Sequence, residues 1–202
     1  MFDRNKKLII VKGVKIPIDP DFRLMCEYSS AVSRSDKRAL RDIAGRFFFA
    51  GLPFGVEPAD ALDGMGCFYA DGIAPDREEK EGGSDSGKKT CFDFEEDSAY
   101  FKAAFLSEYG IDLEAAELHW FTFCELFRGL PDECRLKRIM AIRNENLSEI
   151  KSKSERAHIA KLQKIFALKK HRPKKFKSAA ERDAAMKEDL RRKVQEVREN
   201  ES

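Results

Sequence analysis

The sequence predicts a mainly α-helical protein that begins with a small β-hairpin. Apolar residues recur every three or four positions through most of the chain, a short β-branched alternation lies near the N-terminus, and one internal stretch has almost nothing to bury. These patterns divide the 202 residues into four parts. The parts are an N-terminal lobe of hairpin plus helices (1–71), a flexible linker or insertion (72–91), a compact helical core unit (92–170) and a charged C-terminal helical tail (171–202).

The hairpin is expected within residues 8–18, where β-branched side chains flank the pair Lys12-Gly13. Pro17 has no backbone N–H to donate, so its strand is expected at the edge of a sheet. The residues from Phe22 onward fit the start of a helix, and a strand is the alternative.

Two more helices are expected in the N-terminal lobe. Ser35 can cap a helix that runs to about Ala50, because the apolar side chains of this segment fall on one stripe. Pro58 is suited to the first turn of the next helix, where a missing N–H costs nothing.

Helical periodicity returns at Phe92. Asp93 or Asp97 can cap a helix that Gly110 closes, and Asp112 is expected to cap an aromatic helix that ends at Gly129. Three more helices are expected: one capped by Asp132, a longer polar one with apolar positions from Leu147 to Phe166, and a charged one at about 178–199.

The charge is unevenly distributed along the chain. Residues 1–134 carry a net charge of −9 and residues 135–202 a net charge of +11. This uneven distribution of charge permits self-association, binding of an acidic partner or contact with nucleic acid. The basic stretch 169–177 could bind phosphates, but acidic residues are interleaved through 181–201, so nucleic acid is not the expected partner.

Composition places the protein in a reducing compartment away from membranes. The five cysteines follow no C-x-x-C spacing, and neither a signal peptide nor a stretch long enough to span a bilayer is evident. We expect a soluble intracellular protein.

No catalytic, metal-binding or cofactor-binding residues are predicted, and the protein is not expected to be an enzyme. The three histidines lack zinc spacing, and the glycine-rich stretch 82–89 lacks the Ser or Thr of a phosphate-binding loop. His119, on the aromatic segment, is expected to be a hydrogen-bonded, partly buried side chain rather than a base.

The segment 92–145 resembles the Gp-fifteen tail protein family of tailed bacteriophages and prophages. The residues that carry the resemblance are Phe101, Ala104, Phe105, Tyr109-Gly110-Ile111-Asp112-Leu113, Leu118-His119-Trp120, Phe123, Leu126, Gly129-Leu130-Pro131 and the run 139–143. A looser similarity extends to residues 16–23 and 67–69.

The resemblance implies a non-enzymatic tail assembly chaperone of long-tailed, non-contractile phages. Such a protein would bind the tape-measure protein in the host cytoplasm, aid assembly of the tail tube, interact with tail-tube subunits as a second partner, and be absent from the mature virion. Self-association, a structural role in the tail and nucleic-acid binding through the basic C-terminal region are the alternatives. Trp120, Phe121 and Phe127 are the candidate partner-binding residues, and Arg143 and Asp112 are expected to pair or to cap.

Overall fold

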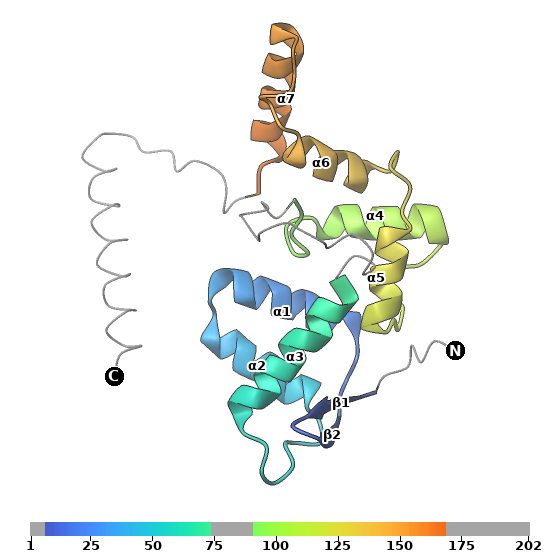
Figure 1. The fold of residues 1–202 in the computed structure, drawn as a ribbon. Coiled ribbons are helices and arrows are strands. Elements are labelled where there is room, and N and C mark those ends of the chain that lie inside the picture. The colour runs from blue at the N-terminus through green and yellow to red at the C-terminus, as the bar shows by residue number, and fades with distance from the viewer. Residues whose placement is uncertain (1–6, 74–90, 169–202) are drawn as a thin grey trace, which may run out of the picture. The chain divides into compact units, whose positions relative to one another are not determined.

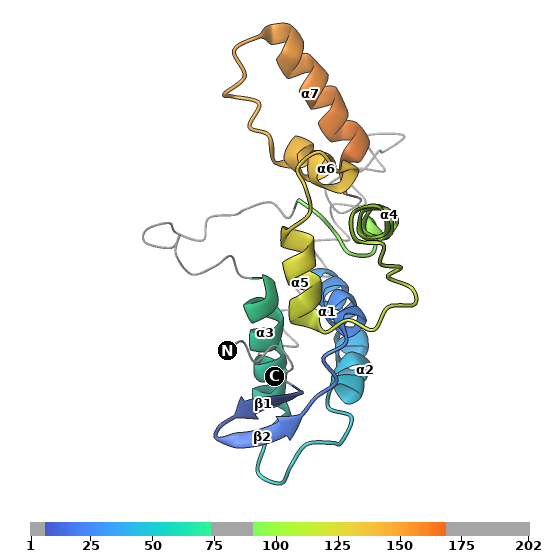
Figure 2. The same cartoon turned by 90° about the vertical axis from the view of Figure 1, so that its right-hand side faces the viewer.

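The computed structural model describes residues 7–73 and 91–168 of the chain. Within these ranges it contains seven helices and one two-stranded antiparallel sheet, which confirms the predicted fold class (Figure 1). The elements are β1 (Leu8–Val11), β2 (Val14–Pro17), α1 (Phe22–Arg34), α2 (Lys37–Phe47), α3 (Pro58–Ile73), α4 (Ser98–Tyr109), α5 (Trp120–Arg128), α6 (Arg135–Asn144) and α7 (Lys153–Phe166). Helix α5 contacts both α1 and α3, while α4 contacts α6 and α6 contacts α7 (Figure 2).

The hairpin forms where the sequence predicts it. Lys12 and Gly13 both have positive φ angles, 48° and 84°, as a two-residue turn that matches the twist of the strands requires. Ile9 pairs with Ile16, and Ile16 is completely buried. The inner face of the hairpin therefore packs on the helices, and β1 contacts α3.

Helix caps differ in part from the predictions. The segment after Asp21 is a helix rather than the alternative strand, and the Asp21 side chain accepts from the N–H of Arg23. Ser35 does not cap α2: it ends α1 in a left-handed conformation, and Asp36 accepts from the first N–H groups of α2. This helix ends at Phe47 rather than Ala50, whereas Pro58 does begin α3 as expected.

The aromatic helix begins eight residues after its predicted cap. Asp112 binds the N–H of Glu114 and starts only a turn, so the prediction that it caps the aromatic helix was wrong. His119 holds the N-cap position of α5, and its Nδ1 accepts from the N–H of Phe121. The predicted ends at Gly110 and Gly129 are confirmed as the C-caps of α4 and α5.

The last two helices also start later than predicted. Helix α6 begins at Arg135, after Cys134 rather than after Asp132, and α7 begins at Lys153, after Ser152. The side chain of Ser152 accepts from the N–H of Glu155, which is ordinary N-cap geometry. The predicted linker lies almost entirely outside the described residues, as does the charged tail.

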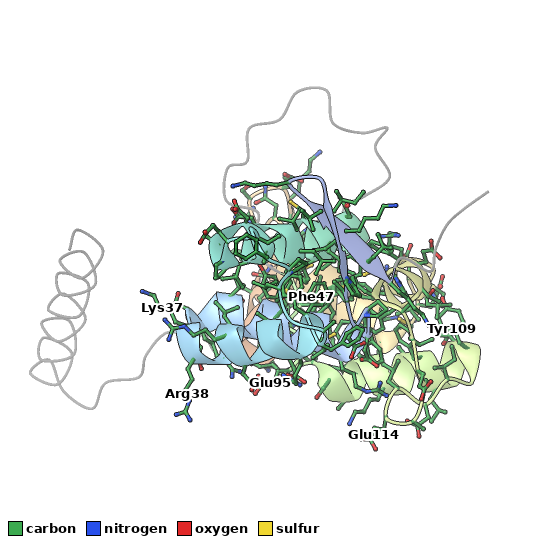
Figure 3. The ribbon with its side chains drawn as sticks, turned by 90° about the horizontal axis from the view of Figure 1, so that it is seen from below. Lys37, Arg38, Phe47, Glu95, Tyr109 and Glu114 are labelled. Carbon is green, nitrogen blue, oxygen red and sulfur yellow. The ribbon has the colours of Figure 1, made fainter. Side chains whose placement is uncertain are left out.

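Residues from both sides of residues 74–90 share one cluster of buried apolar side chains. Phe123 of α5 stacks on Phe22 of α1 with ring centroids 4.7 Å apart, and on Phe105 of α4 at 5.1 Å. In Figure 3 Phe47 lies in the interior, where its ring contacts Phe68 of α3. Aromatic packing on α5 therefore links α1 to α4.

Trp120 joins the start of α5 to the end of α3. The indole is completely buried, stacks on the ring of Tyr69 and donates from Nε1 to the Tyr69 carbonyl at 3.1 Å. Arg128 donates to the Gly72 carbonyl at 2.7 Å. Side chains of α5 thus bind two carbonyls near the end of α3, and the carbonyl of Gly72 is among the last four of the helix, which have no N–H partner within it.

Asp97, at the start of α4, and Arg143, in α6, form a buried ion pair. The guanidinium donates to both carboxylate oxygens, at 2.6 and 2.9 Å, and the Asp97 side chain is 2% exposed. Arg143 also donates to the carbonyls of Cys91 and Phe166. Arg143 thus pairs, with Asp97, and Asp112 caps a turn, as the expectation that these residues pair or cap allowed. One buried guanidinium ties three chain segments together.

Gly72→Ala is expected to lower the free energy of unfolding by about 1–3 kcal/mol, because an added Cβ would lie 2.2 Å from Nε1 of Trp120. Gly45→Ala is the matched control: nothing lies within 4 Å of its Cβ position in α2, so the gain in helix propensity should stabilise the protein by up to about 1 kcal/mol. Urea denaturation followed by circular dichroism measures both. Equal effects would contradict the tight contact at Gly72.

Arg143→Met should lower the free energy of unfolding by about 3–5 kcal/mol, because it leaves the Asp97 carboxylate buried without its cation. Arg138→Met in the same helix changes an exposed residue and should alter stability by less than about 0.5 kcal/mol. Chemical denaturation of the two variants provides the comparison. A small effect at position 143 would contradict a stabilising role for the buried pair.

Candidate functional site

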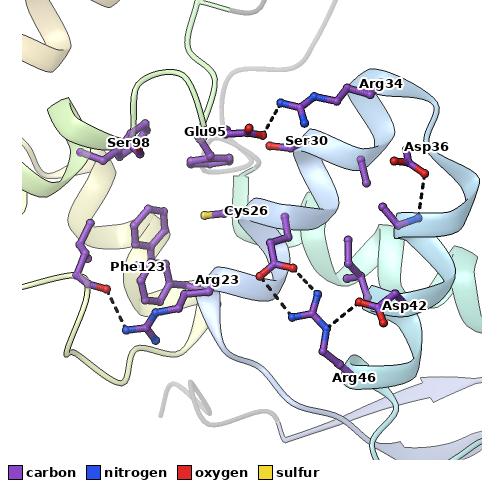
Figure 4. A pocket seen from close by; sticks show the side chains of 18 of the residues that line it. Arg23, Cys26, Ser30, Arg34, Asp36, Asp42, Arg46, Glu95, Ser98 and Phe123 are labelled. Atoms are coloured by element: carbon purple, nitrogen blue, oxygen red, sulfur yellow. Dashed lines mark hydrogen bonds and ion pairs between the residues drawn. The ribbon is translucent and has the colours of Figure 1, made fainter.

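A groove of about 650 Å³ lies over one face of α1, between α2 and the segment that leads into α4 (Figure 4). We call it the α1 groove. Its apolar lining residues are Phe22, Cys26, Ala31, Ala39, Ile43, Phe94, Phe101, Leu113 and Phe123. Its polar and charged lining residues are Arg23, Glu27, Ser30, Arg34, Asp36, Asp42, Arg46, Glu95, Ser98, Lys102 and Glu114.

The sequence of α1 explains the base of the groove. Arg23, Glu27, Ser30 and Arg34 are spaced by four, three and four residues, so they lie along one stripe of the helix. The opposite face of α1 is apolar, with Met25 completely buried in the core. The amphipathic pattern therefore holds α1 in place and leaves a polar stripe facing the groove.

The charged side chains around the groove neutralise one another. Arg34 pairs with Glu95, and Lys102 pairs with Glu114. Arg46 pairs with both Glu27 and Asp42. Asp36 accepts from the first N–H groups of α2. Because cations and anions both line the groove and most of them are paired, the groove offers no concentrated charge of either sign.

Arg23 fixes one side of the groove to a distant segment. Its guanidinium donates to the carbonyls of Leu113, Glu114 and Ala116, at 2.8–3.0 Å, and pairs with Asp21. These contacts hold the turn after Asp112 against the start of α1. The groove wall that contains Leu113 and Glu114 is thus positioned by a side chain some 90 residues earlier in the chain.

The cysteine thiols at the groove and behind it are poor nucleophiles. Burial raises the pKa of the Cys26 thiol well above its usual range. Burial also raises the pKa of Cys124, to about 12. Since the thiolate is the reactive form, both thiols are protonated at neutral pH. Within residues 7–73 and 91–168, no group of three or more His, Cys, Asp or Glu side chains could hold a metal ion.

The structure separates the three predicted partner-binding residues. Trp120 is completely buried in the core and is not at the surface in this structure. Phe121 is half-buried against Phe68 of α3, and Phe127 is half-buried between Phe92 and Phe101. None of the three lines the α1 groove. A partner-binding role for them stays a prediction.

The groove residues of α1 and α2 were missed in the sequence. The polar stripe of α1 is visible in the spacing of its residues, but a polar stripe is also the ordinary solvent face of a helix. What turns this face into a groove is the approach of Phe94 and Leu113 from the second half of the chain, and no local pattern predicts that approach.

Comparison with known protein families gives a match over the second half of the chain. A model of the Bacteriophage Gp15 protein family matches residues 68–168, which is half of the chain. The match runs from the second half of α3 to the end of α7 and confirms the resemblance found in the sequence. No curated protein and no solved structure matches. In the two described segments, no helix is long and apolar enough to cross a membrane.

Alkylation of the native protein should distinguish the cysteines. Cys67 is exposed and should be labelled by iodoacetamide first. Cys26 and Cys124 should react slowly at pH 8, and faster only as the pH rises towards their raised pKa values or the protein unfolds. Peptide mass spectrometry at several pH values measures this order. Rapid labelling of Cys26 at neutral pH would contradict the raised pKa of its thiol.

Proposed function

The chain belongs to the Bacteriophage Gp15 protein family, and on that basis we propose that it is a tail assembly chaperone that binds the tape-measure protein. In this proposal the protein acts without catalysis, in the cytoplasm of the bacterial host. It keeps amphipathic helices of its client soluble, aids assembly of the tail tube, and is absent from the mature virion.

The α1 groove is the observation that supports binding of a helical client. Apolar side chains from α1, α2, α4 and α5 line it together, and α1, α2 and α4 leave an open side. An amphipathic helix placed there would bury its apolar stripe against this lining, as helices bind in the grooves of other helical proteins. A client helix would complete a local bundle with α1 and its neighbours.

The paired charges at the rim suit a client of mixed charge. Arg34 and Glu95 are both more than half exposed, so their attraction contributes only about 0–1 kcal/mol to stability. Such pairs can be exchanged for equivalent pairs with Lys, Arg, Asp or Glu of a client at little cost. A uniformly charged ligand such as nucleic acid would meet both signs at this rim and gain little there.

The proposal is tested by co-expression with the tape-measure protein of the same phage. The full chain should hold the tape-measure protein in the soluble fraction and co-purify with it. Ser30→Trp places a large ring in the groove from the stripe of α1 and should weaken binding at least about tenfold. Leu106→Asp changes an exposed apolar residue of α4 outside the groove and should bind like the unchanged protein.

Two outcomes would count against the proposal. Failure of the folded full chain to co-purify with the tape-measure protein would contradict the chaperone role. Detection of the protein in purified virions by mass spectrometry would favour the structural alternative. A complex that forms equally well with Ser30→Trp would leave the chaperone role standing and place the client elsewhere on the surface.

A further inference from the structure

The loop between α2 and α3 exposes a concentration of large apolar side chains. Phe54 is fully exposed, Phe49 is 65% exposed and Leu52 is 37% exposed. These are three of the nine large apolar side chains that are exposed among the described residues. Apolar residues gathered in this way on one short segment are typical of an interaction surface.

This loop is held in a defined conformation. The N–H of Val56 donates to the carbonyl of Pro53 at 3.2 Å, and Gly55 has a φ of 87°, so residues 53–56 form a β-turn. We call it the Phe54 turn. Val56, at its end, and Phe48, at the start of the loop, are buried and anchor the segment to the core. Phe54 is therefore presented on a fixed turn, with little ordering left to occur on binding.

The same chain contains a surface that fits this side chain. The α1 groove is lined by aromatic rings, among them Phe22, Phe94 and Phe101, and a further phenyl ring would bury its area against them. No residue of the loop lines the groove within one copy. Only another copy can therefore bring a Phe54 turn to it.

The charges of the two surfaces are compatible with this match. Residues 47–56 carry no charged side chain, and the groove cations Arg34, Arg46 and Lys102 are paired with Glu95, Glu27 and Glu114. An uncharged segment can enter such a groove without leaving a buried ion unpaired. We propose that Phe54 of one copy inserts into the α1 groove of a second copy.

The geometry of this contact determines the kind of assembly. The turn and the groove are different surfaces, so two copies can meet in either of two ways. In a head-to-tail contact each copy offers a Phe54 to one neighbour and a groove to another, which forms rings or open chains. In a reciprocal two-fold contact each Phe54 enters the groove of the other copy, which closes a dimer. The inference does not depend on the client's identity, although a client helix and Phe54 could not occupy one groove together.

The test uses sedimentation velocity of the full chain, without client, over a range of concentrations. The unchanged protein should self-associate as concentration rises, to a dimer through the reciprocal contact or beyond a dimer through the head-to-tail contact. Phe54→Asp should weaken self-association at least about tenfold, and so should Ser30→Trp. Leu106→Asp is the matched control, because it places the same charge at another exposed apolar position, and it should assemble like the unchanged protein.

Mixing the two defective variants gives the sharpest result. Phe54→Asp retains an intact groove and Ser30→Trp retains an intact turn, so an equimolar mixture has one functional contact. It should form a species of dimer mass and nothing larger. Ala39→Trp, from α2, replaces Ser30→Trp if circular dichroism shows that the latter is unfolded.

Three results would overturn the proposal. The unchanged protein could remain monomeric at every soluble concentration. Alternatively, Phe54→Asp could assemble as strongly as an unchanged protein that does assemble. The mixture could also stay monomeric while each folded variant is monomeric, which would show that an intact Phe54 turn does not bind an intact groove. A Phe54→Asp variant that self-assembles normally but loses the tape-measure protein would assign the turn to the client instead.

Discussion

Trp120 joins the two described segments of the chain, and the α1 groove depends on this contact. The indole donates to the Tyr69 carbonyl and stacks on the Tyr69 ring, which fixes the start of α5 against the end of α3. From there α5 directs Phe123 between Phe22 and Phe105. Since Phe123 and Phe22 line the groove while Phe105 packs beneath it, the apolar base of the groove follows from the position of one tryptophan.

Polar contacts then set the walls of the groove against this apolar base. Arg23 binds three carbonyls of the turn after Asp112, and Arg143 binds Asp97 together with two carbonyls from other segments. Each guanidinium has several donors in a fixed plane, so one side chain can satisfy acceptors from different parts of the chain. The burial of hydrophobic area holds the unit together, while these arginines determine which loops lie beside which helices.

The limits of prediction from the sequence follow from the same contacts. The hairpin, the start of α3 at Pro58 and the ends of α4 and α5 were predictable, because a turn pair, a proline and two glycines act locally. The start of α5 was not. Asp112 does begin a turn, but Arg23 takes the carbonyls of Leu113, Glu114 and Ala116, which a continuing helix would need for its own N–H groups. The groove was missed for the same reason, since its two sides come from distant segments.

The contact between Gly72 and Trp120 also means that the connection between α3 and the second half of the chain does not have to position α5. Its ends are held by burial of the indole, and losing a buried tryptophan side chain costs about 3–5 kcal/mol. Doubling the length of a flexible loop costs only about 0.6 kcal/mol of closure entropy. Residues inserted between positions 73 and 91 should therefore leave α5 in place, so the groove does not depend on the length of this connection.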